Sequence, residues 1–132
     1  MRVLAPMLVA TLAIACGSLG PSPLATGVWG GDHIAMTITE SSVHVELDCA
    51  HGDVPNPIMI DAHDQFSVAG TFVREHGGPI RVDETIDPHP AMYTGSVSSN
   101  SMTLTIQQTD TNQTIGTFTL VRGTSGRVVK CL

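Results

Sequence analysis

The amino-acid sequence predicts an all-β domain, a small antiparallel meander that closes as a barrel, with a β-sandwich as the alternative. Past residue 27, apolar and polar residues alternate with a period of two, and no stretch sustains the 3.6-residue period of a helix. Polar clusters of Ser, Asn, Asp, Thr and Gly separate the alternating segments at hairpin length. Hydrophobic residues make up 42% of the 132 residues, which is enough for a packed core.

Residues 1–15 predict a signal peptide. Arg2 precedes an apolar run that is too short to span a bilayer, which needs about 20 residues. The run ends in Ala13-Ile14-Ala15-Cys16, which resembles the processing box of bacterial lipoproteins, where the cysteine becomes the lipidated first residue. We therefore expect an exported protein anchored to the membrane at the cell envelope through Cys16. Ordinary secretory cleavage before Cys16, or a later cut near Ala25, would instead give a secreted or periplasmic protein.

Residues 16–26 are rich in Gly, Ser and Pro and carry no charge, so we expect a flexible tether followed by a domain over residues 27–132. Of the three cysteines, Cys49 and Cys131 remain once Cys16 is set aside for lipidation. An even pair in an exported domain predicts a disulfide bond between them. Such a bond would enclose nearly the whole domain.

The expected strands are recognised by apolar side chains at every second position. A first strand opens at residue 27, and a bulge at Gly116 accounts for the change of parity between Ile115 and Phe118. Two longer connections, 50–57 and 75–90, are expected as loops, and the second is of a length that compact domains usually keep for function or leave mobile. The other expected strands cover 34–38, 43–49, 66–72, 93–97, 102–106 and 128–131.

Gly27-Val28-Trp29 at the start of the first strand, with Arg122, Arg127 and Lys130 near the last strand, resembles the small up-and-down barrels of the lipocalin and avidin kind. The resemblance implies that Trp29 packs under the terminal cation, a contact with a favourable cation–π term. The alternative is an ordinary core tryptophan at a strand start.

Four further motifs resemble a family of short exported bacterial proteins. The resemblance implies an exported small β domain and no particular activity. The motifs are Gly27-Val28-Trp29-Gly30-Gly31-Asp32-His33-Ile34, Asp48-Cys49-Ala50-His51-Gly52, Gly70-Thr71-Phe72-Val73-Arg74-Glu75-His76-Gly77-Gly78-Pro79 and Lys130-Cys131-Leu132.

The charge is acidic and unevenly placed. A formal net charge of −6 and an aromatic content of 4% argue against nucleic-acid binding, which needs a basic face or stacking aromatics. Eleven of the 12 acidic residues and all six histidines lie between Asp32 and His89. A functional surface is therefore expected in this half of the chain.

Three short motifs place a histidine beside an acid and glycines, at Asp32-His33, His51 and Glu75-His76. If the three histidines met at one barrel end, they could hold a divalent ion such as zinc, with Asp32 or Glu75 as a further ligand or as a carboxylate that orients a histidine. No established zinc motif is present, and the alternative is that these residues only stabilise glycine-rich corners.

The sequence gives little support to catalysis. There is no Gly-x-Ser-x-Gly motif, so a hydrolase is the least favoured reading of the function. We expect instead a non-catalytic binding module for a small ligand at the open barrel end or for a protein partner across an acidic face. Metal binding is the alternative.

Overall fold

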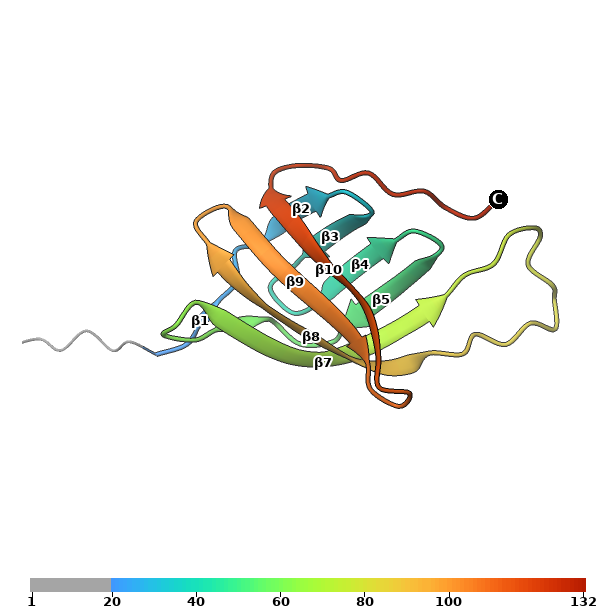
Figure 1. Ribbon diagram of the computed structural model, residues 1–132, viewed down its shortest axis with the longest axis horizontal. Coiled ribbons are helices and arrows are strands. Elements are labelled where there is room, and N and C mark those ends of the chain that lie inside the picture. The colour runs from blue at the N-terminus through green and yellow to red at the C-terminus, as the bar shows by residue number, and fades with distance from the viewer. Residues whose placement is uncertain (1–19) are drawn as a thin grey trace, which may run out of the picture.

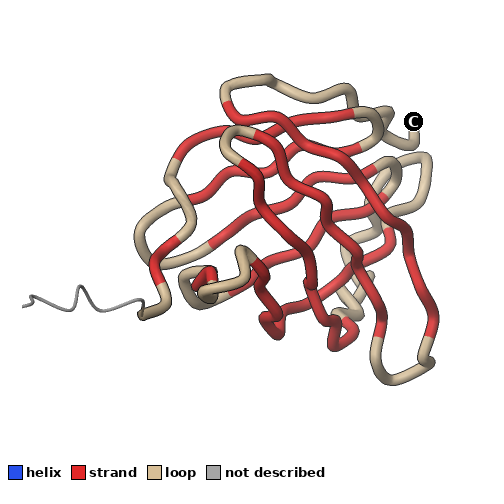
Figure 2. Tube along the Cα trace, turned by 60° about the vertical axis from the view of Figure 1, so that its left-hand side comes forward, coloured by secondary structure: helices blue, strands red, loops and turns tan. Residues whose placement is uncertain are grey.

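The computed structural model describes residues 20–132, which fold into a closed antiparallel barrel with the strand order β10-β2-β3-β4-β5-β7-β8-β9 (Figure 1). This confirms the prediction of an all-β meander closed as a barrel and excludes the sandwich. Figure 2 shows strands and loops only. From residue 20 onward, no helix is long and apolar enough to cross a bilayer.

Eight strands form the barrel, and two short ones form a separate sheet beside it. The barrel strands are β2 Gly27–Gly31, β3 Ile34–Ile38, β4 Val43–Leu47, β5 Ala50–Val54, β7 Gln65–Arg74, β8 His89–Ser98, β9 Ser101–Gln108 and β10 Gln113–Arg122. The separate sheet pairs β1 Ser22–Pro23 with β6 Met59–Ile60.

The interior of the barrel is a packed core, because every second side chain of each strand points inward. Trp29 and Tyr93 are its largest fully buried side chains, and Phe66 and Phe72 are also buried. Phe118 packs against this core at its margin. The expected alternation is borne out in detail, with buried residues that include Ile34, Met36, Ile38, Val43, Val45, Leu47, Met102, Leu104 and Ile106.

The expected bulge in the last barrel strand is confirmed. The register between β10 and β9 shifts between Thr114 and Gly116, so that Leu120 returns to the core. The ladder of β10 with β9 has eight paired positions, whereas that of β10 with β2 has only two, Val121↔Gly30 and Arg122↔Trp29. The β2/β10 contact is therefore the seam of the barrel.

Two sequence predictions of secondary structure are wrong. Residues 50–54, expected as part of a loop, form β5; Gly52 breaks the apolar alternation there because the Tyr93 hydroxyl occupies the place of a side chain. Residues 128–131, expected as a strand, have no ladder partner among the described strands. They form an extended segment that crosses the end of the barrel.

The predicted tether also differs from the structure in its second half. Leu24 is buried in the core cluster, and its backbone N–H donates to the carbonyl of Ile58 at 2.8 Å. Ala25 packs against the same cluster. The fold therefore begins before residue 27, since β1 is held by β6 and Leu24 by the core. Cys16, with the rest of residues 1–19, lies outside the described part of the chain.

Candidate functional site

One end of the barrel collects most of the residues singled out from the sequence. We call it the loop end; it consists of the turns at 32–33, 48–49 and 109–112 and of the long loop 75–88. The chain enters the barrel at β2 from the opposite end, and Figure 1 shows residues 20–26 away from the long loop and the C-terminus.

Residues 127–132, which we call the C-terminal strap, lie across the loop end. Arg127 begins the strap: its N–H donates to the Gly31 carbonyl at 2.9 Å, and its carbonyl accepts from His33 N–H at 2.7 Å. The Arg127 guanidinium donates from Nε to Asp32 Oδ1 at 3.0 Å. The Val129 N–H donates to Asp48 Oδ1 at 2.7 Å. Each of the first two turns therefore supplies a carboxylate to the strap.

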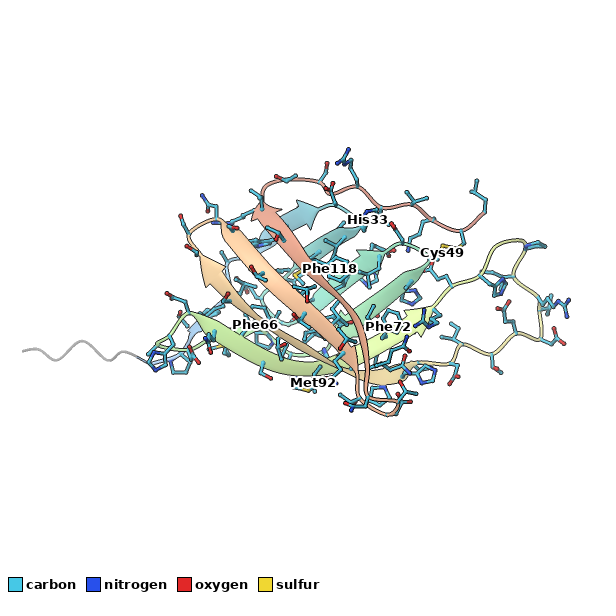
Figure 3. All side chains as sticks on the ribbon, in the orientation of Figure 1. His33, Cys49, Phe66, Phe72, Met92 and Phe118 are labelled. Atoms are coloured by element: carbon cyan, nitrogen blue, oxygen red, sulfur yellow. A yellow bond between two sulfur atoms is a disulfide. The ribbon has the colours of Figure 1, made fainter. Side chains whose placement is uncertain are left out.

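The predicted disulfide bond closes the strap onto the barrel. Cys131 is bonded to Cys49, with 5.0 Å between the Cα atoms and 82 residues of sequence separation. Cys49 has a positive φ of 50° in the turn after β4, and its N–H donates to the Val129 carbonyl at 3.3 Å. Figure 3 shows Cys49 and His33 at the end of the barrel that the C-terminal segment crosses.

Lys130 is the centre of a polar network on the strap. Its Nζ donates to Glu75 Oε2 at 3.0 Å and to the carbonyls of Ala50 and Leu47 at 2.9 and 3.2 Å, and it forms an ion pair with Glu46. Burial opposes the charged ammonium, but the bonds to Glu46 and Glu75 outweigh it and raise the pKa of Lys130. The ammonium thus joins the C-terminal strap to β4, β5 and the base of the long loop.

The two glutamates of this network are also bound to histidines. His51 Nδ1 lies 2.7 Å from Glu75 Oε2, and His44 Nε2 lies 2.6 Å from Glu46 Oε1. His44 Nδ1 lies 2.7 Å from Asp53 Oδ1, so both of its ring nitrogens face carboxylates. Both can donate only in the imidazolium form. The bonds to Asp53 and then Glu46 accordingly raise the pKa of His44.

The three histidines predicted as metal ligands lie at the loop end, but each has a carboxylate of its own. His33 Nδ1 lies 2.6 Å from Asp48 Oδ2, His51 pairs with Glu75, and His76 pairs with Glu84. Over residues 20–132, no three His, Cys, Asp or Glu side chains are grouped to hold a metal ion. The structure therefore gives no support to a zinc site built from these histidines.

The pairing of Trp29 with Arg127 is a further correction. The Trp29 indole N–H donates to the Ala25 carbonyl at 3.2 Å, whereas the Arg127 side chain is 84% exposed and bound to Asp32. The backbone of Arg127 bonds to Gly31 and His33 at the end of β2. This position brings its side chain to the Asp32 carboxylate on the surface. Gly27 has a φ of +120°, a left-handed conformation that favours glycine and that explains its place at the start of β2.

The long loop 75–88 is fastened to the barrel and braced across itself. At its base, the Glu75 N–H donates to the Cys49 carbonyl at 2.8 Å. Inside the loop, Arg81 N–H donates to Glu84 Oε2 at 3.1 Å, and the Glu84 N–H returns to the Arg81 carbonyl at 3.1 Å. The His76 imidazole bonds both the Gly77 carbonyl and Glu84; these bonds raise the pKa of His76.

A groove of about 720 Å³ runs between this loop, the strap and the outer wall of the barrel. Val73 forms part of its wall; it points outward from β7 and is nevertheless buried. The other lining residues combine apolar, acidic and basic groups: His51, Arg74, Glu75, His76, Gly78, Ile80, Glu84, Thr85, Ile86, Asp87, His89 and Cys131.

His89 fixes the far end of the loop to the barrel. Its Nδ1 lies 2.7 Å from Asp110 Oδ2 and its Nε2 3.3 Å from Asp87 Oδ2. The bond to Asp110 and the charges of both aspartates raise the pKa of His89 against the effect of burial. In the chain from residue 20 on, the hydrogen bonds of the histidine rings run to carboxylates and one carbonyl, and none pairs a histidine ring with a Ser, Thr or Cys side chain.

Four residues that the structure places in this site were assigned no role in it from the sequence: Glu46, Asp48, Glu84 and Lys130. A signal for two of them was present, because Glu46 and Asp48 alternate with the apolar residues of β4 and so share its outer face with His44. Lys130 and Glu84 gave no such signal, since each contacts segments far away in the sequence or inside an irregular loop. Comparison of the chain with models of protein families, with curated proteins and with solved structures finds no match.

Proposed function

We propose that this protein is an exported, lipid-anchored binding module of the cell envelope, and that it binds a protein partner through its loop end. The observation that carries the proposal is the exposure of three large apolar side chains on one loop: Ile80 is 83% exposed, Val82 108% and Ile86 76%. Exposed apolar clusters on small soluble domains commonly mark contact surfaces.

The filled interior supports a surface-binding function. A lipocalin-like ligand site needs an open cavity inside the barrel, whereas here Trp29, Phe66, Phe72 and Tyr93 pack into it. Recognition is therefore assigned to the outside of the barrel. The second candidate is a small ligand in the groove beside Val73, because a volume of about 720 Å³ falls in the range of small-molecule sites.

The proposed anchor agrees with the placement of the loop end. The chain leaves the barrel at the end opposite to the loop. A lipid on Cys16 would hold that opposite end toward the membrane, so the loop end would face the surroundings. Several acyl chains on one cysteine give stable anchoring, whereas a single chain does not.

The anchor is tested with Cys16→Ser in the producing cells. We expect the native protein in the membrane fraction and the variant in the soluble or unprocessed fraction, because serine offers no thiol for lipidation. Fractionation with mass spectrometry of the mature N-terminus measures this. Cys49→Ser/Cys131→Ser serves as the control, because it replaces the other two cysteines, which form the disulfide bond, and leaves the lipidation site unchanged. A lipid-free native protein would contradict the anchor.

The binding surface is tested with a photo-crosslinking amino acid placed at each end of the barrel in living cells. We expect adducts with protein from positions 80 and 129 at the loop end, and none from positions 99 and 124 at the opposite end. All four positions are exposed, so exposure alone cannot explain a difference. Adducts from the opposite end only, or from none of the four, would contradict a protein-binding loop end.

A further inference from the structure

The tip of the long loop is convex and apolar. Figure 1 shows the segment between β7 and β8 standing out well beyond the barrel. Val82 and Asp83 form the turn at its tip, with Ile80 and Ile86 on either side. A solvated loop tip gains nothing from three large aliphatic side chains, and their exposure costs free energy until a partner covers them.

The loop is pre-organised by bonds that do not involve its apolar side chains. Glu84 holds Arg81 and His76 together, Glu75 is bound to His51 and Lys130, and Asp87 lies beside His89. The polar side chains thus brace the loop from within and at both ends, while Ile80, Val82 and Ile86 remain free for contact. Rigid loops lose little conformational entropy on binding, which favours affinity.

The loop is acidic as well as apolar. It carries four carboxylates against Arg81: Glu75 and Glu84 are paired with Lys130 and His76, and Asp83 and Asp87 are exposed. An anionic lipid surface would repel such a loop, and the proposed anchor places the membrane at the other end of the barrel. A protein pocket with basic side chains around its opening would attract it.

We propose that the loop tip, residues 79–86, inserts into a concave apolar pocket of a partner protein whose rim carries Lys or Arg side chains. This inference rests on the proposed function and adds the mode of contact. Val82 enters the pocket first, and Ile80 and Ile86 contact its walls. Asp83 on the tip and Asp87, directly after it, meet the basic rim. The groove below the loop is not required for this contact.

The test uses the full anchored protein in the producing cells, with the photo-crosslinking amino acid at position 82 or 129. Position 129 is compared with position 82 to separate contact through the strap from contact through the loop tip. Val129 is also an apolar residue of the loop end and is 67% exposed, but it lies on the strap. We expect a discrete protein adduct from position 82. Its yield should fall about tenfold with Ile80→Ser/Ile86→Ser and stay unchanged with Val121→Ser, an exposed valine on β10.

Charge reversal tests the rim. Asp83→Lys/Asp87→Lys should reduce the adduct from position 82 about tenfold, and Glu40→Lys, in a turn at the opposite end, should leave it unchanged. Circular dichroism and the retained disulfide bond confirm folding of each variant. Mass spectrometry of the adduct should identify a protein whose crosslinked site is an apolar pocket beside Lys or Arg.

The other outcomes separate this inference from the proposed function. Adducts from position 129 but not 82 overturn insertion of the loop tip and leave a protein-binding loop end. A lipid adduct, or an adduct with a second copy of this chain, overturns the partner described here. An adduct that survives both the serine and the lysine substitutions overturns the apolar and acidic contacts. No adduct from either position overturns both proposals.

Discussion

At the scale of single residues, Gly52 and Tyr93 share one place in the core. The Tyr93 hydroxyl donates to the Thr71 carbonyl at 2.6 Å, and it occupies the position where a Cβ on residue 52 would lie. Burial raises the pKa of Tyr93, so the hydroxyl is protonated at neutral pH and donates this bond. A glycine in β5 is therefore required by a side chain from β8.

Gly52→Ala should destabilise the fold by about 1–3 kcal/mol, because the added methyl overlaps the tyrosine hydroxyl and the Thr71 carbonyl. Tyr93→Phe alone should cost about 1–2 kcal/mol through the unpaired carbonyl. In the double variant the overlap with the hydroxyl is gone. Its loss of stability should therefore be smaller than the sum of the losses in the two single variants. Urea unfolding measures all three free energies.

Gly31→Ala is the control for this cycle. A Cβ there would overlap the Thr119 carbonyl and does not meet Tyr93. Combined with Tyr93→Phe, its penalty should be additive. Additive penalties for Gly52→Ala and Tyr93→Phe would mean that the two residues do not compete for the same space.

At the scale of elements, the C-terminal strap explains why the sequence motifs recur. Asp32, Asp48 and Glu75 each stand in a motif with a histidine or cysteine, and each bonds the strap through Arg127, Val129 or Lys130. The carboxylates are thus docking points for the strap. His33 bonds the second oxygen of Asp48, and His51 shares Glu75 Oε2 with Lys130.

Removal of the disulfide by Cys49→Ser/Cys131→Ser should lower the free energy of unfolding by up to about 4.5 kcal/mol, since the crosslink restricts a long loop of the unfolded chain. Urea unfolding of the oxidised, reduced and serine-substituted proteins measures the effect. Hydrogen exchange at the Val129 N–H should accelerate in the latter two, because the strap loses its covalent attachment.

Arg127→Ala is the matched control on the same strap. Its side chain is largely exposed, and exposed ion pairs contribute little to stability, so the free energy of unfolding should barely change. Equal stability of the oxidised protein and the serine-substituted protein would show that the disulfide does not hold the strap.

The sequence predicts most elements because alternation is a local property. The alternation of Ile34, Met36 and Ile38 predicts β3 directly. The change of parity between Ile115 and Phe118 predicts the bulge of β10. Two elements depend on distant partners. Gly52 interrupts the apolar alternation that would have predicted β5. The space for a side chain there is occupied by Tyr93, 41 positions later in the chain. The strap has apolar residues like a strand, yet it bonds to turns instead of a strand edge.

The candidate site was only partly predictable for the same reason. The sequence places an acid next to His33 and His76 in the chain, Asp32 and Glu75, and these neighbours are not their partners. Their partners in space are Asp48 and Glu84. Neighbouring residues on an extended chain point in opposite directions, so adjacency in sequence does not predict pairing.

At the scale of the whole molecule, histidine–carboxylate pairs link stability to pH. The pKa values of His44, His76 and His89 are raised in the folded protein, so the stability that they contribute is complete below pH 6.5 and is lost as pH rises through the folded values. Burial opposes the charged form of Glu46 and Glu75. The bonds of Glu46 to Lys130 and His44, and of Glu75 to His51 and Lys130, outweigh burial and lower the pKa values of both glutamates. Their contribution is present above pH 4.5 and is lost as pH falls through the folded values.

The protein should therefore be most stable between about pH 4.5 and 6.5 and lose stability toward pH 8. A domain without paired histidines would not show this loss. Melting temperatures measured across this range at constant ionic strength check the trend. His44→Gln should weaken the decrease above pH 6.5. A melting temperature that rises from pH 6 to 8 would contradict the linkage.

The seam of the barrel has a consequence for behaviour in concentrated solution. β2 and β10 share two paired positions, and the strap lies beside them through the bridge between Asp32 and Arg127. If reduction frees the strap, this short ladder is the place where the closed sheet opens first. Opening bares two strand edges, and bare edges pair with those of other molecules. The disulfide therefore also guards the protein against domain swapping and aggregation.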